Sequence, residues 1–417
     1  MSVLSVLSVL PSRRALSMRR RTALPPLVSA AALAAALLTV PAAAAGHTGD
    51  GAARPSAARL YTPPANPAAY DQALDLARSG RLADAAGIVA MAHTPQAVWY
   101  GDQSPAEVEE SARRTVRDAA RKRTTPVFAL YNVPGRDCSN YSGGGASTTA
   151  EYKEWIDAVA RGIGDRPAMV VLEPDSLALL PADCGQDDAQ GTKTAARYDE
   201  VRYAVDSLEP LAGTKVYLDT GHPGWHGVES IVPRLLRAGV GEATGFFTNA
   251  SNYRTEEDSH WYGTLISSCI GYVQDGGEAA ACPNQYWPRA DAETWLKENV
   301  TTPLGERKHF VTDTSRNGLG PWTPPPGKYT DAQDWCNPPG RGLGDRPTLN
   351  TGDPLYDAKL WIKIPGESDG LCLRGTQGPE DPERGMVDPA AGGWFPEQAL
   401  ELVRLAEPPI LGHRPGN

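Results

Sequence analysis

The sequence predicts an α/β fold in which a parallel sheet is rolled into a barrel or near-barrel. Six short, continuously apolar runs alternate with amphipathic segments of helical periodicity. Strands that are apolar on both faces are typical of a parallel sheet covered by helices. Repetition of this strand–helix unit over about 370 residues favours one barrel, with a flat doubly wound sheet as the alternative.

The predicted strands are 127–131, 169–172, 215–218, 245–248, 309–312 and 359–362. The helical segments include 71–77, 105–122, 149–162, 195–211, 229–238 and 290–300. Ser104 is a favourable N-cap for the second of these, with Pro105 in its first turn. No glycine-rich phosphate loop follows any of the strands, so nucleotide binding is not expected.

The first 45 residues have the pattern of a signal peptide. A basic region that includes Arg13 and 19–21 precedes an apolar stretch at 27–40, and small residues follow at 41–45. The apolar stretch is shorter than the about 20 residues that span a bilayer, so export with cleavage is expected. Residues 46–68 are rich in Gly, Ala and Pro and predict a flexible lead-in, followed by one folded domain over 69–417.

The composition excludes several classes of partner. The signal segment carries five arginines and no acid, so the rest of the chain has a formal net charge of −15. This excess of acid argues against nucleic acid or an anionic membrane surface as partner. The six cysteines all follow the signal segment, and an even number in an exported chain indicates disulfides. None has the spacing of a zinc site, so no metal is expected.

Polar residues follow the predicted strands and should meet at one end of the barrel. A single Asp after a strand is more often a turn former or a helix cap. Asp175, for example, could cap a helix near Leu177, and Asp369 before Gly370 could form a plain turn. Five of the six endings contain Asp, and this repetition favours a carboxylate-driven hydrolase. The polar endings are 131–137, Glu173 with Asp175, Asp219 with His222, Asn249 with Asn252, Asp313, and Lys363 with Glu367 and Asp369.

The tryptophans point to a carbohydrate substrate. Four of the ten lie in candidate loops beside Gly or Pro, or among the polar clusters: Trp99, Trp225, Trp322 and Trp335. An exposed indole is a flat apolar surface that suits the C–H face of a pyranose, whereas core packing is expected for Trp155, Trp295 and Trp361. Glycoside hydrolysis requires a protonated carboxylic acid, and crowding of Asp137, Asp175 and Asp219 could raise one pKa enough.

Four motifs together resemble the signatures of glycoside hydrolase family 6, the inverting β-1,4-glucanases of cellulose breakdown. They are YNVPGRDC at 131–138, LEPDSL at 172–177, YLDTGHPGW at 217–225 and IKIPGESDG at 362–370. TNASNY at 248–253 and WCN at 335–337 add to the resemblance, which runs in order from about Trp99 to Leu405. It implies a distorted, partly open, TIM-like barrel of seven parallel strands, with the substrate lying across its top.

The resemblance also implies roles for individual residues. Asp175 would be the general acid, Asp137 would raise its pKa and help to organise water, and Asp369 would be a remote base or charge stabiliser. Asp219 would be a supporting carboxylate, and Tyr131 would press on the distorted sugar. The substrate-binding set would be Trp99, His222, Trp225, Asn249, Asn252, Trp335, Lys363 and Glu367. Disulfides Cys138–Cys184 and Cys336–Cys372 would match the family, with Cys269–Cys282 as an additional one.

One position departs from the family pattern. The loop at 142–146 has Gly143 where the family usually has a second serine that helps to hold the catalytic water. Either Ser142 takes that role or the water is held differently.

The loops that follow residue 336 are short, with only about two dozen residues from Asp369 to Trp394. They resemble the open endoglucanases more than the long-looped cellobiohydrolases, which remain the alternative within the family. The resemblance implies a secreted monomer that acts on β-1,4-glucan chains without a cofactor. A non-catalytic sugar-binding protein of the same fold is disfavoured because Asp175 is present. A carboxylate metalloenzyme is disfavoured because no His pair has ligand spacing.

Overall fold

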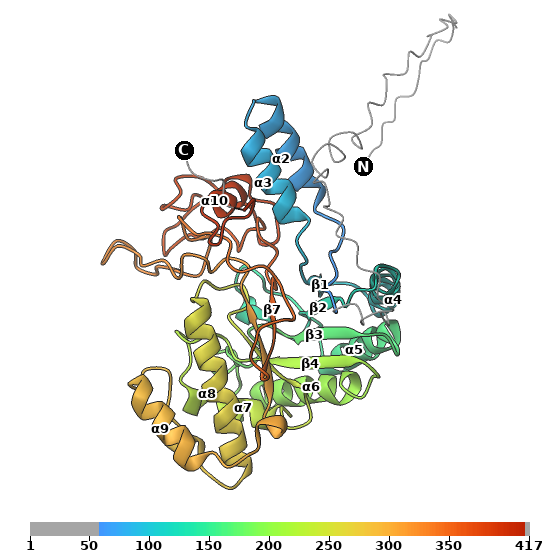
Figure 1. Ribbon diagram of the computed structural model, residues 1–417, viewed down its shortest axis with the longest axis vertical. Helices are drawn as coiled ribbons and strands as arrows, with labels where there is room; N and C mark the ends of the chain where they lie inside the picture. The colour runs from blue at the N-terminus through green and yellow to red at the C-terminus, as the bar shows by residue number, and fades with distance from the viewer. Residues whose placement is uncertain (1–57, 413–417) are drawn as a thin grey trace, which may run out of the picture. The chain divides into compact units, whose positions relative to one another are not determined.

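The computed structural model describes residues 58–412, so the predicted signal peptide and the first part of the predicted lead-in lie outside the described residues. Seven strands form one sheet, in which every neighbouring pair is parallel and the order follows the sequence (Figure 1). The strands are β1 (Val98–Tyr100), β2 (Val127–Leu130), β3 (Ala168–Leu172), β4 (Thr214–Asp219), β5 (Gly245–Thr248), β6 (His309–Asp313) and β7 (Tyr356–Leu360).

The strand order confirms the predicted barrel and rules out the flat alternative. A doubly wound sheet reverses its strand order at a switch point, whereas here each strand lies beside the next one in the chain. The two end strands approach each other through Ala97, whose N–H donates to the Trp361 carbonyl at 2.9 Å. Trp99 adds a bond from its Nε1 to the Ile362 carbonyl at 2.8 Å. Within the described residues no β1–β7 ladder forms, so the barrel is partly open.

Two strand predictions need correction. β1 was not predicted as a strand, and Trp99, expected in a loop, is its middle residue. Its three residues are too few to produce a recognisable apolar run. β7 begins at Tyr356, three residues before the predicted start, because Asp357 and Lys359 interrupt the apolar pattern in its first half.

Alternate strand residues build two separate cores. In β2, Val127 and Ala129 belong to the cluster inside the barrel, together with residues such as Phe247. Phe128 and Leu130 belong to the larger cluster between the sheet and the helices. This arrangement follows from the two-residue period of a strand. It explains why the predicted strands are apolar without alternation.

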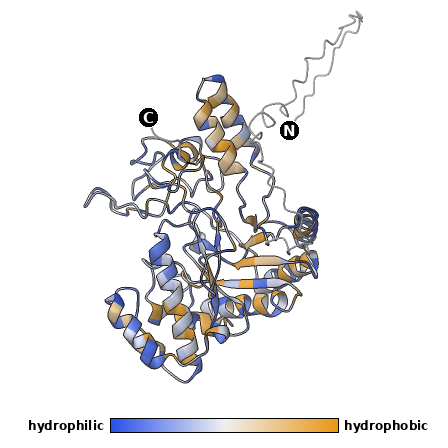
Figure 2. Ribbon diagram, viewed as in Figure 1, coloured by the Kyte–Doolittle hydropathy of each residue, from blue (hydrophilic) through white to orange (hydrophobic). Residues whose placement is uncertain are grey.

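The helices confirm the alternating pattern, and α4 to α6 lie beside the sheet in Figure 1. Figure 2 shows an apolar sheet and a predominantly polar α4. Ser104 and Glu107 cap α4 reciprocally, which matches the expected N-cap. The helices are α2 (Pro67–Arg78), α3 (Leu82–Ala92), α4 (Pro105–Lys122), α5 (Thr149–Ile163), α6 (Thr192–Leu208), α7 (Val228–Arg237), α8 (Glu256–Gln274), α9 (Arg289–Asn299) and α10 (Pro396–Arg404). Of these, α3, α8 and α10 were not predicted.

Helices α2, α3 and α10 share a third apolar cluster that includes Ile88, Trp361 and Leu402. The described end of the predicted lead-in is packed against the domain, since Leu60 is buried and bridges to Thr125. No helix within residues 58–412 is both long and apolar enough to cross a membrane.

The three disulfides are those expected: Cys138–Cys184, Cys269–Cys282 and Cys336–Cys372. The first joins the loops that follow β2 and β3, and the third joins two segments on either side of β7. In the chain-entropy account, closing loops of this length stabilises the fold by roughly 3–4 kcal/mol each. Both bridges therefore restrain the loops that carry predicted site residues.

Candidate active site

A cleft of about 730 Å³ lies at the carboxyl ends of the strands. It brings together all the predicted catalytic and substrate-binding side chains except Asp219 and Asn249. Because the strands are ordered by sequence, Trp99 on β1, Tyr131 after β2, Asp175 after β3 and Trp225 after β4 follow one another along the rim. The eleven predicted residues that line the cleft are Trp99, Tyr131, Asp137, Asp175, His222, Trp225, Asn252, Trp335, Lys363, Glu367 and Asp369.

Asp175 lies in the turn after β3 with φ of +68°, a left-handed conformation that is unusual outside glycine. The Tyr131 hydroxyl is 3.4 Å from its Oδ2. Burial raises the pKa of Asp175 well above its ordinary value, and the negative charges of Asp219 and Asp137 raise it further. The alternative reading as a helix cap is wrong, because the next described helix, α6, begins only at Thr192.

Asp219 lies behind this turn and is almost completely buried. Its Oδ2 accepts the N–H groups of Leu177 (3.2 Å) and Ala178 (2.9 Å), and its Oδ1 accepts that of Gly221 (2.9 Å). Burial raises its pKa, and the three N–H donors oppose this rise. Of the two carboxyls, Asp219 holds the negative charge more readily because it has three donors. It therefore shapes the Asp175 turn, and its negative charge contributes to the raised pKa of Asp175.

Asp137 begins a turn in which three consecutive residues, Asp137, Cys138 and Ser139, all have positive φ. Its Oδ2 accepts the Ser142 N–H at 2.8 Å. Burial raises the pKa of Asp137, while this bond works in the opposite direction. Strained backbone is retained where surrounding structure enforces it, and here the Cys138–Cys184 bridge fixes the turn against the loop after β3.

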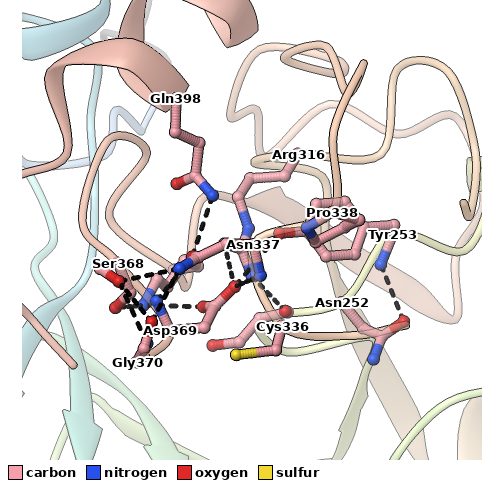
Figure 3. A network of polar contacts seen from close by, with 12 residues as sticks. Asn252, Tyr253, Arg316, Cys336, Asn337, Pro338, Ser368, Asp369, Gly370 and Gln398 are labelled. Atoms are coloured by element: carbon pink, nitrogen blue, oxygen red, sulfur yellow. Dashed lines mark hydrogen bonds and ion pairs between the residues drawn. The ribbon is translucent and has the colours of Figure 1, made fainter. Parts of the chain in front are cut away.

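Asp369 is held in a different electrostatic environment, which Figure 3 shows. Its Oδ2 accepts Arg316 Nη1 at 2.8 Å and the Asn337 N–H at 3.0 Å, and Lys363 Nζ is 3.1 Å from Oδ1. Burial alone would raise the pKa of Asp369, but the Arg316 and Lys363 charges outweigh it and lower the pKa to about 2. Asp369 is therefore an anion at neutral and mildly acidic pH.

Asn337 orients the Asp369 loop (Figure 3). Its Oδ1 accepts the Asp369 N–H at 2.8 Å and the amide of Gln398 at 3.0 Å. Its Nδ2 donates to Ser368 Oγ and to the Gly370 carbonyl. All these groups are buried, so the position of Asp369 is fixed by bonds that water cannot replace.

The structure does not bring Asn249 into the cleft. Its side chain is fully buried and is used by the backbone, donating to the Asp313 carbonyl at 2.8 Å and accepting from the Arg254 N–H at 3.0 Å. We therefore assign Asn249 to loop support rather than to substrate binding. Asp313 also supports loops, because its carboxylate accepts the N–H groups of Ser251 and Lys363.

Exposed indoles lie at two places in the cleft. The exposed fractions of Trp225 and Trp335 are 38% and 36%, high values for large apolar side chains that line a cavity. Trp99 is half-buried and packs edge-on against Tyr131, with ring centroids 5.5 Å apart. The fourth loop tryptophan, Trp322, lies outside the cleft and packs against the Arg374 guanidinium.

The tryptophans expected in the core behave as predicted. Trp155 and Trp361 are fully buried, and Trp295 is partly buried against the main core. Sequence context therefore separated the core indoles from those of the cleft.

His222 is a neutral hydrogen-bonding group. Burial lowers its pKa to about 3, and the nearby charges of Arg254 and His226 contribute. Its Nδ1 accepts the Gly224 N–H at 3.1 Å, so the ring proton is on Nε2. A neutral imidazole with a free N–H suits a sugar hydroxyl and does not titrate in the physiological range.

Comparison with known proteins decides the family. The family model described as "Glycosyl hydrolases family 6" matches residues 55–406. The chain belongs to this family.

Among curated relatives, endoglucanase A of Cellulomonas fimi is 40% identical over 329 residues, covering 78% of this chain and 57% of that protein. Endoglucanase 1 of a Streptomyces species is 36% identical, covering 74% and 69%. A probable 1,4-beta-D-glucan cellobiohydrolase C of Aspergillus fumigatus is 34% identical, covering 68% and 62%. The chain thus spans little more than half the length of the Cellulomonas relative.

A solved structure of similar fold is the endoglucanase Cel6 of Mycobacterium tuberculosis, in complex with methyl-cellobiosyl-4-deoxy-4-thio-β-D-cellobioside. It is 35% identical to this chain, with a TM-score of 0.63, covering 84% of this chain and 97% of that one. The expected family resemblance and fold are therefore confirmed.

The Gly143 departure from the family pattern has a steric cause. A Cβ at this position would lie 2.7 Å from Ser139 Cα and 3.0 Å from the Ser139 carbonyl carbon, too close for a side chain without backbone movement. Ser142 and Gly143 both line the cleft. Ser142, whose N–H bonds Asp137, is therefore the serine next to Gly143 that lines the cleft.

Several residues that line the cleft were not among the predicted site residues, including Arg136, Asn140, Tyr141 and Arg254. Arg136 bonds the Tyr131 and Ser142 carbonyls at 2.7 and 2.9 Å, and so links two functional loops. Arg254 follows Tyr253 in one of the family motifs, but its guanidinium reaches the cleft only because the chain turns at Asn249. Proximity to motifs was the only available signal for these residues.

One cluster has the spacing of metal ligands, formed by Cys372, Asp381 and Asp388. Cys372 is in a disulfide, Asp381 bonds Arg374 Nε at 2.8 Å, and Asp388 Oδ2 accepts Asn337 Nδ2 at 2.7 Å. This cluster is a structural support beneath the Asp369 loop.

We predict that replacing Asp369 with Asn lowers the free energy of unfolding by roughly 3 kcal/mol at pH 7, because it leaves two buried cations without an anion. The pKa of Asp369 is depressed from 3.8 to about 2, so its contribution is present above pH 4 and is lost as the pH falls towards 2. Urea unfolding should therefore show a difference from the wild type that shrinks between pH 4 and pH 2.

The matched control is Asp334→Asn, because Asp334 is half-exposed and its carboxylate is 4.0 Å from Arg254. This variant should change stability little at either pH. A loss of stability for Asp369→Asn that does not depend on pH would contradict the ion-pair account.

Proposed function

We propose that this protein is a secreted, monomeric, inverting endo-β-1,4-glucanase that hydrolyses internal bonds of cellulose and related β-glucans. The observation that carries the proposal is Asp175. Its carboxyl lies in the cleft, is kept protonated by burial and by Asp219 and Asp137, and is flanked along the rim by Tyr131 on one side and Trp225 on the other. The endoglucanase names of two bacterial relatives support the substrate class.

Bond cleavage begins with proton transfer. The protonated carboxyl of Asp175 donates to the glycosidic oxygen as the bond from that oxygen to the anomeric carbon breaks, leaving Asp175 as a carboxylate. Positive charge develops on the sugar ring, and the fixed anion Asp369 stabilises it. Because Arg316 and Lys363 lower its pKa to about 2, Asp369 stays ionised and contributes a fixed negative charge without accepting a proton.

Water completes the reaction from the opposite face of the sugar, and this inverts the anomeric centre. Asp137 and Ser142 lie together in the cleft, joined by the Ser142 N–H, and we assign them to orienting this water. The attacking water gives its proton to the Asp137 carboxylate, which becomes a carboxylic acid. His222, Asn252, Lys363 and Glu367 supply polar contacts to the flanking glucoses, and Trp225 and Trp335 supply apolar surfaces.

The internal mode of cleavage rests on the short loops around the cleft. Only about two dozen residues connect Asp369 to Trp394, and Trp225 and Trp335 remain more than one-third exposed. A chain could therefore settle into the cleft anywhere along its length. A cellobiohydrolase is the second candidate, because the Aspergillus relative that bears this name is also similar.

Replacing Asp175 with Ala should reduce kcat on β-1,4-glucans by about 100- to 10,000-fold, because the leaving oxygen loses its proton donor. The loss should be much smaller on aryl cellobiosides, whose phenolate leaving groups need little protonation. Binding of cello-oligosaccharides should remain near that of the wild type. Near-normal turnover of cellulose oligomers by this variant would remove the central assignment.

Products should appear first as the α-anomer. Proton NMR of freshly hydrolysed cellopentaose, recorded faster than mutarotation, measures the anomeric ratio directly. Initial release of the β-anomer would mean that configuration is retained and would exclude the direct attack of water.

Viscosity of carboxymethylcellulose should fall steeply while few reducing ends appear, because internal cuts shorten chains most effectively. The two quantities should be measured on the same sample over the first minutes. If cellobiose accumulates from the start and viscosity barely changes, the enzyme works from chain ends and the cellobiohydrolase alternative holds.

A further inference from the structure

A second groove, of about 660 Å³, adjoins the cleft on the far side of Trp99. It lies between the carboxyl end of β1 and the first turns of α4. Three residues, Trp99, Tyr131 and Arg136, line both hollows, so the groove and the cleft share a wall. The residues that line only the groove and that bear on its chemistry are Gly101, Asp102, Gln103, Glu107, Ser111 and Arg114.

The order of the strands shows where this groove leads. Along the rim, Trp225 follows β4, Asp175 follows β3 and Tyr131 follows β2. Trp99 lies within β1, which is the end strand of the described sheet. A linear substrate that crosses Asp175 and continues past Tyr131 and Trp99 therefore leaves the cleft beside α4. The groove lies at this exit.

The groove carries groups that suit a neutral polyhydroxyl ligand. The Arg114 side chain is exposed, and among the described residues it donates only to Ser111 Oγ, at 3.1 Å on the same helix. Gln103 accepts the Gly101 N–H through Oε1 at 2.9 Å, which leaves its amide N–H groups available to a ligand. Glu107, by contrast, is occupied in capping α4 through Ser104. Arg114 and Gln103 are thus the donors that a sugar hydroxyl would meet.

We propose that this groove is an additional binding site for glucose units of the substrate chain that extend past Trp99, with Arg114 as its main hydrogen-bond donor. The inference rests on the proposed action on β-1,4-glucans. It predicts that affinity increases for oligosaccharides long enough to reach beyond Trp99. Arg114 then determines the preferred chain length without taking part in bond cleavage.

The test compares two arginines of one helix. Arg114 lines the groove, whereas Arg117 is exposed one turn further along α4 and lines neither hollow. Each is replaced with Ala in an Asp175→Asn background, so that bound oligosaccharides are not consumed. Arg114 makes only a surface contact, so its removal should leave the fold intact. Calorimetry then gives Kd for cellotriose and cellohexaose.

Arg114→Ala should weaken cellohexaose binding by about three- to tenfold, the effect of one lost hydrogen bond, and leave cellotriose binding unchanged. Arg117→Ala should change neither. With Asp175 intact, Arg114→Ala should also change which bond of end-labelled cellohexaose is cut. Fewer cuts should come from complexes in which glucose units extend past Trp99.

Equal binding of cellohexaose by the Arg114 and Arg117 variants, together with an unchanged cleavage register, would overturn the inference. If the wild-type enzyme cleaves cello-oligosaccharides in that case, the proposed function stands and only the groove is misassigned. If the wild-type enzyme neither binds nor cleaves any of them, the proposed function itself fails.

Discussion

Buried carboxylates that accept backbone N–H groups hold the active-site loops in place. Glu173 accepts the N–H groups of Asn132 and Val133, which connects the turn after β3 to the loop after β2. Asp219 and Asp313 do the same for the loops after β3 and for those after β5 and β7. The carboxyl ends of parallel strands bring such groups together, and without these acceptors the buried N–H groups of tight turns would have no partner.

This way of building the loops has an electrostatic consequence. Around Asp175 the supporting groups are other acids, and no Arg or Lys forms an ion pair with it among the described residues. Around Asp369, Arg316 and Lys363 supply two cations. The cleft therefore contains one carboxyl whose pKa is raised and one whose pKa is depressed. Such separation suits the two chemically identical side chains to the proposed roles of proton donor and fixed anion.

The sequence was sufficient for the fold class, six of the seven strands and most of the cleft, because continuous apolar runs and strand-end polar clusters are direct consequences of a parallel barrel. The sequence was insufficient for elements that are very short or that lack a clear apolar pattern. β1 is only three residues long, and α8 contains many small and polar residues, so neither has a clear periodic pattern.

The sequence also could not predict which side chains point into the cleft. Asn249 and Asn252 belong to one motif, yet the first is buried under the loop and the second lines the cleft. Asp175 and Asp219 each follow a buried strand, and only the turn conformation decides which of them reaches the substrate. Arg254 and Arg136 enter the cleft through loop geometry that no local pattern reveals.

The central claim is that Asp175 is protonated in the free enzyme because its own burial and the negative charges of Asp219 and Asp137 raise its pKa. Carbon-13 NMR of protein labelled at the aspartate carboxyl carbons tests it, with Asp175→Asn used to assign the signal. The account predicts that the Asp175 signal remains that of a carboxylic acid well above the ordinary Asp pKa of about 4, and that Asp219→Asn moves its titration to lower pH. A signal that titrates near pH 4, and that Asp219→Asn does not move, would contradict the account.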